Sequence, residues 1–312
     1  MWPSASPKLA RPEACTIIDP STLSTKQKDA RTGVLLALGS FVIWGLSPLF
    51  FALVNDVPPV EVVAHRILWS LPVIAAYALA TGRLPRFLQA GRDPRMMLVL
   101  MTATAFISVN WFVFIFAIQI GQTAQASFGY YIYPIVAVIL GATIFRERIT
   151  RLQWIAAGMA TTGVLLIALE RGTLPWIALV VAGSFAVYGV IRKAVEVGPL
   201  VGVLWELTLI SGPLLAYLWF VDGGVFVQDS DTALLLIGCS LFTGIPLVMY
   251  VEAAKRLDFS TNGVLFYLNP TLQFISALIL GEVLSLPVLG AFAIIWAGVA
   301  LYCYDLMRRR AG

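Results

Sequence analysis

Long apolar runs recur along the whole 312-residue chain, and no other feature restricts its fold as much. Segments of about 20 mostly apolar residues follow one another, and each is long enough to cross the hydrocarbon core of a bilayer. Only 12% of the residues are charged, whereas about 25% are charged in an ordinary soluble domain. Too few polar residues remain to cover a soluble core of this size, so we predict an integral membrane protein.

The spans are predicted to be α-helices, because the segments are too uniformly apolar for the alternation of a transmembrane β-strand. The connections are short and carry turn residues, such as NDVPP at 55–59 and DGG at 222–224. The expected fold class is therefore an all-α membrane protein with ten transmembrane helices. The predicted spans are residues 33–54, 59–81, 95–119, 124–145, 152–169, 174–191, 199–221, 232–254, 260–281 and 285–304.

The distribution of lysine and arginine predicts the orientation, because cytoplasmic connections carry the excess of both residues. If the N-terminal tail is cytoplasmic, every lysine and arginine except Arg66 and Arg171 falls on the cytoplasmic side. Arg192 and Lys193, for example, fall in the loop after the sixth predicted helix. Losing or adding one helix would break this alternation, so both termini are expected in the cytoplasm. The same distribution explains the net charge of +4 without a nucleic-acid partner.

The chain is predicted to consist of a polar tail, two halves and a short basic end. Residues 1–30 are rich in Pro, Ser and Lys and lack the apolar centre of a signal peptide. They are predicted to form a disordered cytoplasmic tail. Two halves of five helices follow, at residues 31–170 and 171–306, and residues 307–312 form a basic cytoplasmic C-terminus.

The two halves resemble each other in sequence. GSFVIWG at 39–45 matches GSFAVYG at 183–189, SFGYYIYP at 127–134 matches GVLFYLNP at 263–270, and ATTGVL at 160–165 corresponds to AGVAL at 297–301. Because five is an odd number, the second half would enter the membrane from the opposite side. This predicts a 5+5 inverted-topology repeat, which is typical of secondary transporters. Chance recurrence of small residues in membrane helices is the alternative.

Two ionisable residues fall at matching positions of this repeat. The alignment of Pro59 with Pro199 places Arg66 opposite Glu206. Each lies about seven residues into its helix, or ~10 Å along the axis. An ionisable group at that depth faces a partner or a water-filled cavity.

Each of these groups has a functional and a structural interpretation. Arg66 is either a substrate anchor or gate, or a structural partner of Glu61 or of a lipid headgroup. Glu206 has either a proton-linked or cation-binding role, or belongs to a structural ion pair. His65, which aligns with Trp205, is of a type that carries protons near neutral pH, although its place beside Arg66 favours a packing role.

Aromatic and amide side chains deep in the predicted helices are expected to line a cavity, because their polar tips need partners. Packing between helices is the alternative for each of them. The candidates are Trp44, Tyr130, Tyr133, Tyr188, Tyr250, Tyr267, Asn110, Asn262, Asn269 and Gln273. Pro134 and Pro270 are each expected to kink a helix by removing a backbone hydrogen bond, as a moving element or as a static bend.

Several of these stretches resemble the EamA-type branch of the drug/metabolite transporter superfamily, and together they are similar to its RarD group. The resemblance covers roughly residues 32–305 and rests on EVVAHRILWS at 61–70, RERITRLQW at 146–154, WELTLISGP at 205–213 and GIPLVMYVEAAKRLDFSTNGVLFYLNPTLQF at 244–274. It implies ten helices in an inverted repeat, a bacterial inner-membrane location and transport of small metabolites or drugs. It also implies a cavity lined by the first, third, fourth, sixth, eighth and ninth helices.

The function expected is that of a permease that exports small organic solutes by alternating access. The chain has no P-loop sequence, so a gradient of protons, another coupling ion or the substrate would supply the energy. The expected partners are a small-molecule substrate and the lipid bilayer, and the expected state is a monomer or weak dimer. The small-residue face AAGMATTG at 156–163 is a candidate contact between copies.

Other classes of function have less support in the sequence. A single histidine and three widely separated cysteines predict no metal site and no cofactor. The same scarcity of catalytic groups argues against a membrane-embedded enzyme. A non-transporting membrane sensor or assembly partner remains the alternative to a transporter.

Overall fold

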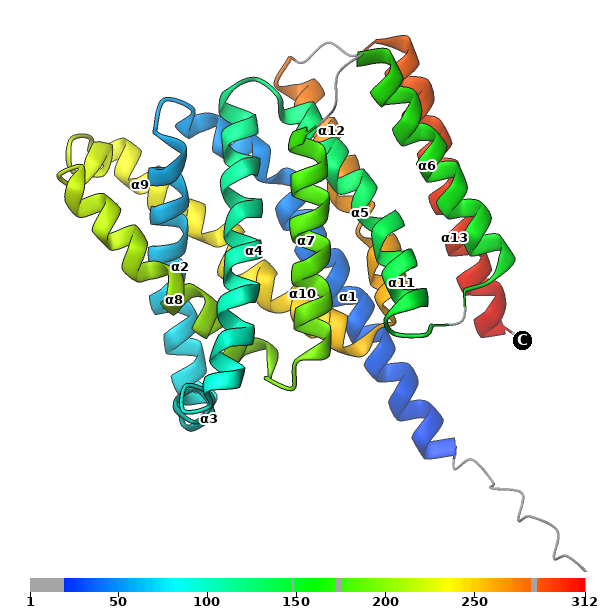
Figure 1. The fold of residues 1–312 in the computed structure, drawn as a ribbon, viewed down its shortest axis with the longest axis horizontal. Coiled ribbons are helices and arrows are strands. Elements are labelled where there is room, and N and C mark those ends of the chain that lie inside the picture. Colours follow the sequence, from blue (N-terminus) through cyan, green and yellow to red (C-terminus); the bar gives the residue numbers. More distant parts are fainter. Residues whose placement is uncertain (1–19, 148, 172–175, 282–284, 312) are drawn as a thin grey trace, which may run out of the picture.

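The computed structural model describes residues 20–147, 149–171, 176–281 and 285–311, and its elements are helices (Figure 1). Eight described segments are long and apolar enough to cross a membrane, which confirms the all-α membrane class. The first half contains α1 (Pro20–Phe51), η1 (Ala52–Val54), α2 (Pro59–Ala80), α3 (Leu84–Ala90), α4 (Pro94–Gln119), α5 (Thr123–Thr143) and α6 (Arg151–Arg171). The second half contains α7 (Trp176–Ala194), α8 (Pro199–Phe220), η2 (Gly224–Val227), α9 (Ser230–Gly238), η3 (Cys239–Phe242), α10 (Gly244–Arg256), α11 (Phe259–Leu265), α12 (Leu268–Ile279) and α13 (Leu286–Ala311).

The first helix starts earlier than the sequence suggested. α1 begins at Pro20, so residues 20–30 are helical rather than disordered. Proline is favoured at the first position of a helix, and the Lys, Gln, Ala and Arg residues that follow are good helix formers. Residues 1–19, the rest of the predicted disordered tail, lie outside the described part of the chain.

The ninth and tenth predicted spans differ most from the prediction. Residues 259–279 form two short helices, α11 and α12, because Pro270 has no N–H to donate to the carbonyl of Phe266. That carbonyl instead accepts from the amide of Asn269 at 2.9 Å. The apolar part of α13, Leu286–Tyr302, is shorter than the other spans. Pro134, by contrast, lies within α5, which runs without interruption from Thr123 to Thr143.

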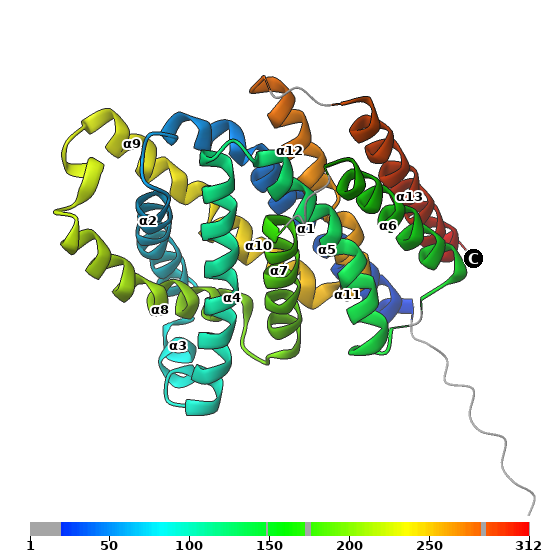
Figure 2. The same ribbon diagram turned by 45° about the horizontal axis from the view of Figure 1, so that its top comes forward.

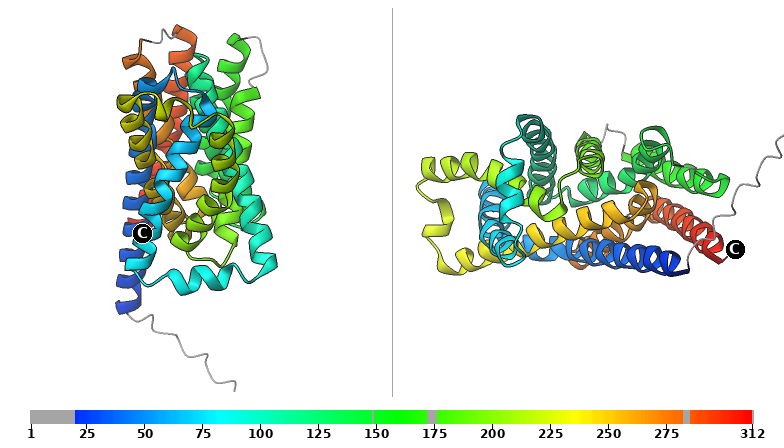
Figure 3. Two further views of the ribbon diagram at one scale, coloured as in Figure 1. Left: turned by 90° about the vertical axis from the view of Figure 1, so that its left-hand side faces the viewer. Right: turned by 90° about the horizontal axis from the view of Figure 1, so that it is seen from below.

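The helices form two layers whose contacts occur in matching pairs. Seen from below, α4, α7, α5 and α6 lie in one layer, and α1, α10, α12 and α13 lie in the other (Figure 3). α1 packs on α10 and α12, while its equivalent α7 packs on α4 and α5. α2 packs on its own equivalent α8, and α6 on its own equivalent α13. These reciprocal contacts are what an approximate two-fold axis between the halves would produce.

Equivalent glycines bring α6 and α13 into close contact at the edge of the molecule (Figure 2). A Cβ atom on Gly163 would lie 2.8 Å from the carbonyl oxygen of Ala291, and one on Gly298 would lie 2.9 Å from that of Ala156. Ala156 and Ala160 are buried in the same contact. The small-residue face at 156–163 is therefore used largely inside the molecule, where glycine and alanine let two backbones approach.

Candidate functional site

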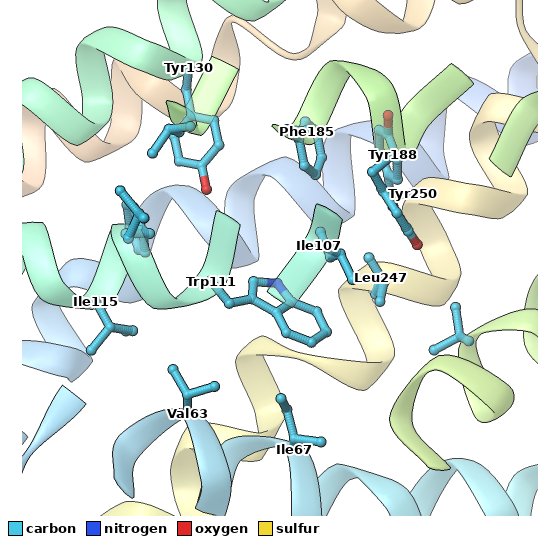
Figure 4. Close-up of a cluster of buried hydrophobic side chains, with 14 of the residues drawn as sticks. Val63, Ile67, Ile107, Trp111, Ile115, Tyr130, Phe185, Tyr188, Leu247 and Tyr250 are labelled. Carbon is cyan, nitrogen blue, oxygen red and sulfur yellow. The ribbon is translucent and has the colours of Figure 1, made fainter. Parts of the chain in front are cut away.

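A small chamber lies between the two halves, at the meeting point of α1, α2, α4, α5, α7 and α12. Its volume is about 30 Å³, enough for roughly two water molecules. Its wall consists of seven aromatic side chains, four neutral polar side chains and one charged side chain: Trp44, Phe51, Trp111, Phe114, Tyr130, Phe185, Phe266, Ser47, Asn110, Asn269, Gln273 and Arg66. Figure 4 shows Trp111, Tyr130 and Phe185 reaching from different helices toward the same region.

Six of the thirteen charged, aromatic and amide candidates meet at this chamber, although they are far apart in the sequence. These six are Trp44, Arg66, Asn110, Tyr130, Asn269 and Gln273. The helices differ in part from those that the family resemblance implied. The second helix contributes Arg66 to the wall, whereas the eighth span contributes no lining side chain among those described.

Amide side chains in the wall are largely held by neighbouring groups. Asn110 Nδ2 donates to the carbonyl of Val181 at 2.9 Å, and the hydroxyl of Tyr130 donates to Asn110 Oδ1 at 2.9 Å. Gln273 Nε2 donates to Asn269 Oδ1 at 3.0 Å. Gln273 Oε1 is buried and has no hydrogen-bond partner among the described residues. The wall therefore contains a fixed polar network with one acceptor left open.

Arg66 is the charged residue of the wall, and its partners are neutral. Its Nε donates to the hydroxyl of Thr243 at 2.7 Å, and its Nη2 donates to the carbonyl of Phe242 at 3.1 Å. The guanidinium carbon lies 5.0 Å from the ring centre of Phe51 and 5.6 Å from that of Trp111. Among the described residues, Nη1 is buried without a hydrogen-bond partner and Arg66 takes part in no ion pair. The predicted structural pair with Glu61 is therefore not formed.

Arg66 can bind the eighth span because that span is interrupted. α9 ends at Gly238, the short helix η3 follows, and Thr243 has non-helical dihedral angles before α10 begins. Pro246 lacks the N–H that would normally bond to the carbonyl of Phe242, four residues earlier. Trp44 Nε1 donates to that free carbonyl at 3.1 Å, alongside Arg66. Broken helices of this kind are tolerated in membranes where other groups satisfy the backbone, and they mark transporter binding sites.

His65 faces away from the chamber and packs against η2. Its ring stacks on Phe226, with ring centres 4.4 Å apart and planes inclined by 14°. Glu61 lies in the same cluster, where it accepts from the amide of Phe226 at 3.1 Å and its Oε1 lies 4.0 Å from His65 Nε2. At the matching position of the second half, Trp205 stacks on Phe87 with a ring separation of 4.3 Å. This match indicates a packing role for His65.

Glu206 also lies outside the chamber, in a buried ion pair. Its Oε1 is 3.1 Å from Arg192 Nε, and its Oε2 accepts from the hydroxyl of Tyr188 at 3.1 Å. Arg192, expected in a cytoplasmic loop, is wholly buried near the end of α7 and donates to the carbonyl of Pro199 at 3.2 Å. A side chain at Gly202 would overlap its guanidinium group. The structural interpretation of Glu206 is the one this geometry favours.

The other predicted tyrosines form the packing behind the wall. The hydroxyls of Tyr133 and Tyr250 are 2.9 Å apart in a fully buried contact. Tyr267 packs against Tyr131, with ring centres 6.0 Å apart. Asn262 is fully buried in α11, and neither of its amide atoms has a hydrogen-bond partner among the described residues. Tyr133 and Tyr250 contact each other instead of lining the chamber. Tyr267 directly follows Phe266, which occupies the position that faces the chamber.

The other six side chains of the wall were not predicted from the sequence. Trp111 follows Asn110 directly, and Phe266 precedes Tyr267, so both were one residue from a predicted candidate. Phe185 lies inside the repeated GSF motif, which was a usable signal. Phe114 is one helical turn from Asn110 and could have been found from that spacing. Thr243 and the carbonyl of Phe242 could have been located from Pro246.

A second, larger hollow lies between α1, α2, α8 and α10, with a volume of about 540 Å³. Its wall is mainly apolar, with Arg83 and Glu252 among its few charged residues. Val73 and Tyr77 in this wall are more than half exposed on the outside of the helix bundle. This hollow therefore resembles a lipid-facing groove, and polar groups converge at the central chamber instead.

Comparisons with known proteins agree with this architecture. Residues 31–169 match the EamA-like transporter family. Protein RarD of Streptomyces exfoliatus is 36% identical over 90% of this chain and 91% of its own length. The uncharacterized transporter YojE of Bacillus subtilis is 34% identical over 90% of this chain and 96% of its own. A protein of known crystal structure has the same fold, with a TM-score of 0.67 at 21% identity over 87% of this chain and 96% of the other. The chain is therefore a multi-pass membrane permease that belongs to the EamA-like transporter family and is similar to its RarD group.

Proposed function

We propose that the protein is a secondary transporter that exports small organic metabolites or drugs by alternating access. The observation that carries this proposal is the central chamber, which has walls from both halves and lies beside two interrupted spans. Secondary transporters place their substrate sites at such repeat interfaces, next to broken helices. The membrane is proposed to be the bacterial inner membrane, with both termini in the cytoplasm.

The interrupted spans are proposed as the moving elements. α10 and α12 are short helices that follow breaks at Thr243 and Phe266, so each can tilt without bending a continuous helix. Arg66 binds the first of these breaks from α2, on one side of the molecule. Glu206 and Arg192 join α8 to α7, and the predicted inverted repeat would place them nearer the other side. These two contacts would bias opposite ends of the transport cycle.

Reconstitution into lipid vesicles tests the proposal. A panel of amino acids, nucleosides and antibiotics, including chloramphenicol, is loaded into the vesicles, and efflux is followed with and without a pH gradient. We expect faster efflux of at least one solute than from protein-free vesicles, and a pH-dependent rate if protons supply the energy. A sensor or assembly partner would leave every efflux rate at the protein-free level, which would rule out transport of these solutes.

A further inference from the structure

We infer that the central chamber binds a monovalent carboxylate with a flat apolar body, and that Arg66 holds its carboxylate group. The inference rests on the proposed transport function and specifies the substrate class of the same site. It depends on three observations in the described part of the chain: a buried cation without a counter-charge, an aromatic wall, and the lack of an acidic side chain in that wall.

The guanidinium group of Arg66 has unused binding capacity. An arginine carries five N–H donors, and the described contacts use Nε and Nη2 while Nη1 has no partner. Arg66 is only 3% exposed, and burial of an unpaired charge is unfavourable. An anion in the chamber would offset this cost.

The buried glutamates that match or precede Arg66 are already engaged elsewhere. Glu61, five residues before Arg66 on the same helix, accepts from the amide of Phe226 and lies beside His65. Glu206, its counterpart in the repeat, is paired with Arg192. The counter-charge of Arg66 would therefore come from a ligand, since neither acid is available to supply it.

The shape and charge of the wall define the ligand further. One guanidinium fork matches one carboxylate, so a monoanion fits better than a dianion. Seven aromatic rings surround the remaining space and suit a flat, apolar body. No lining side chain in the described structure is acidic, so an ammonium group would find only neutral acceptors such as Gln273 Oε1. The chamber of about 30 Å³ accommodates the carboxylate group, and the body of the ligand requires the halves to part.

Benzoate and benzamide test this inference, because the two molecules have nearly the same shape and differ in charge. Their affinities, and that of zwitterionic phenylalanine, are measured by titration calorimetry on the full-length protein in lipid nanodiscs. We expect benzoate to bind at least about tenfold more tightly than benzamide or phenylalanine, as for a charge-assisted contact. In Arg66→Gln, the affinities for benzoate and benzamide should become equal within about twofold.

Two further variants keep the test decisive if Arg66→Gln folds poorly. Gln273→Glu places a carboxylate of almost unchanged shape in the chamber wall, and it should also abolish the preference for benzoate. Arg83→Gln removes an arginine of the second hollow and should leave that preference unchanged. Equal affinities in the unmodified protein, a preference that survives both chamber variants, or a loss confined to Arg83→Gln would each overturn the inference.

Vesicle efflux separates this inference from the proposed function. If chloramphenicol leaves the vesicles but benzoate and benzamide bind equally, transport stands and the anion site is wrong. If benzoate binds through Arg66 but no panel solute or benzoate crosses the membrane, the anion site stands and the transport proposal fails.

Discussion

Arg66 and Glu206 occupy matching positions of the repeat, yet their charged groups have different kinds of partner. The Glu206 cluster, which consists of Glu206, Arg192 and Tyr188, satisfies its charge with an internal cation and a hydroxyl. In the Arg66 cluster, which consists of Arg66, Trp44, Thr243 and the carbonyl of Phe242, the described partners of the arginine are neutral. Trp44 and Tyr188 are also equivalent by the repeat. Matching positions of the two halves therefore hold one buried charge with an internal counter-charge and one without.

The difference indicates different roles for two positions that match in the sequence alignment of the halves. A buried ion pair with both partners in place contributes to the fold chiefly because loss of either partner is costly. A buried cation that lies in the wall of a chamber and lacks an acid is poised to bind something else. The following changes test this difference, in order of their expected effect on folding stability.

Glu206→Gln should have the largest effect on stability, because it leaves the wholly buried Arg192 without its counter-charge. We expect the free energy of unfolding to fall by about 3–5 kcal/mol, measured by thermal unfolding in nanodiscs, while the protein still inserts. The double variant Glu206→Gln with Arg192→Gln is the control and should recover much of the loss. A single variant as stable as the unmodified protein would show that the cluster is not a structural pair.

Replacement of the two equivalent aromatic donors, Tyr188 and Trp44, should lower the free energy of unfolding by smaller and unequal amounts. Tyr188→Phe removes a hydrogen bond to a carboxylate and should cost about 1.5–3 kcal/mol. Trp44→Phe removes a hydrogen bond to a neutral carbonyl and should cost about 0.5–1.5 kcal/mol. The comparison uses the same unfolding measurement, and the reverse order would mean that the Arg66 cluster is the more important for stability.

Arg66→Gln should change stability by less than about 1 kcal/mol, because the loss of two hydrogen bonds is offset by removal of an uncompensated buried charge. The rate at which the transported solute leaves the vesicles, by contrast, should fall at least about tenfold. Arg83→Gln serves as the matched arginine control and should keep normal efflux. Severe destabilisation of Arg66→Gln, or efflux equal to that of the unmodified protein, would remove the distinction between the clusters.

His65→Phe should have the smallest effect, because a phenylalanine keeps the stacking on Phe226. We expect a change of less than about 1 kcal/mol in unfolding free energy and an efflux rate whose pH dependence is unchanged. A shifted pH profile would instead support a proton-carrying role for His65.

The sequence was sufficient to predict the class of fold and part of the chamber. Apolar runs of membrane-spanning length identified eight spans that the structure describes. Trp44, Arg66 and Tyr130 were each predicted as cavity or gating candidates, and all three line the chamber. These signals are strong because apolar length and repeated polar residues do not depend on the details of packing.

The remaining features depend on rotation of each helix about its axis, which the sequence does not determine in uniformly apolar segments. Tyr133 and Tyr267 are close to lining residues but point elsewhere. Arg192 was assigned to a loop because its predicted helix ended one residue earlier, although the helix continues to Ala194. Because the predicted helix ended three residues too early, Arg192 was not identified as the partner of Glu206.

The interlocking of the two halves has a consequence for any protein with only one of them. α6 of the first half meets α13 of the second through reciprocal glycines, and α2 packs on α8 at the opposite end of the bundle. A lone five-helix half would expose both of these faces, and its only complementary surface would be that of another copy inserted upside down. A five-helix forerunner of this architecture would therefore need dual insertion and antiparallel pairing, which fusion into one chain makes obligatory.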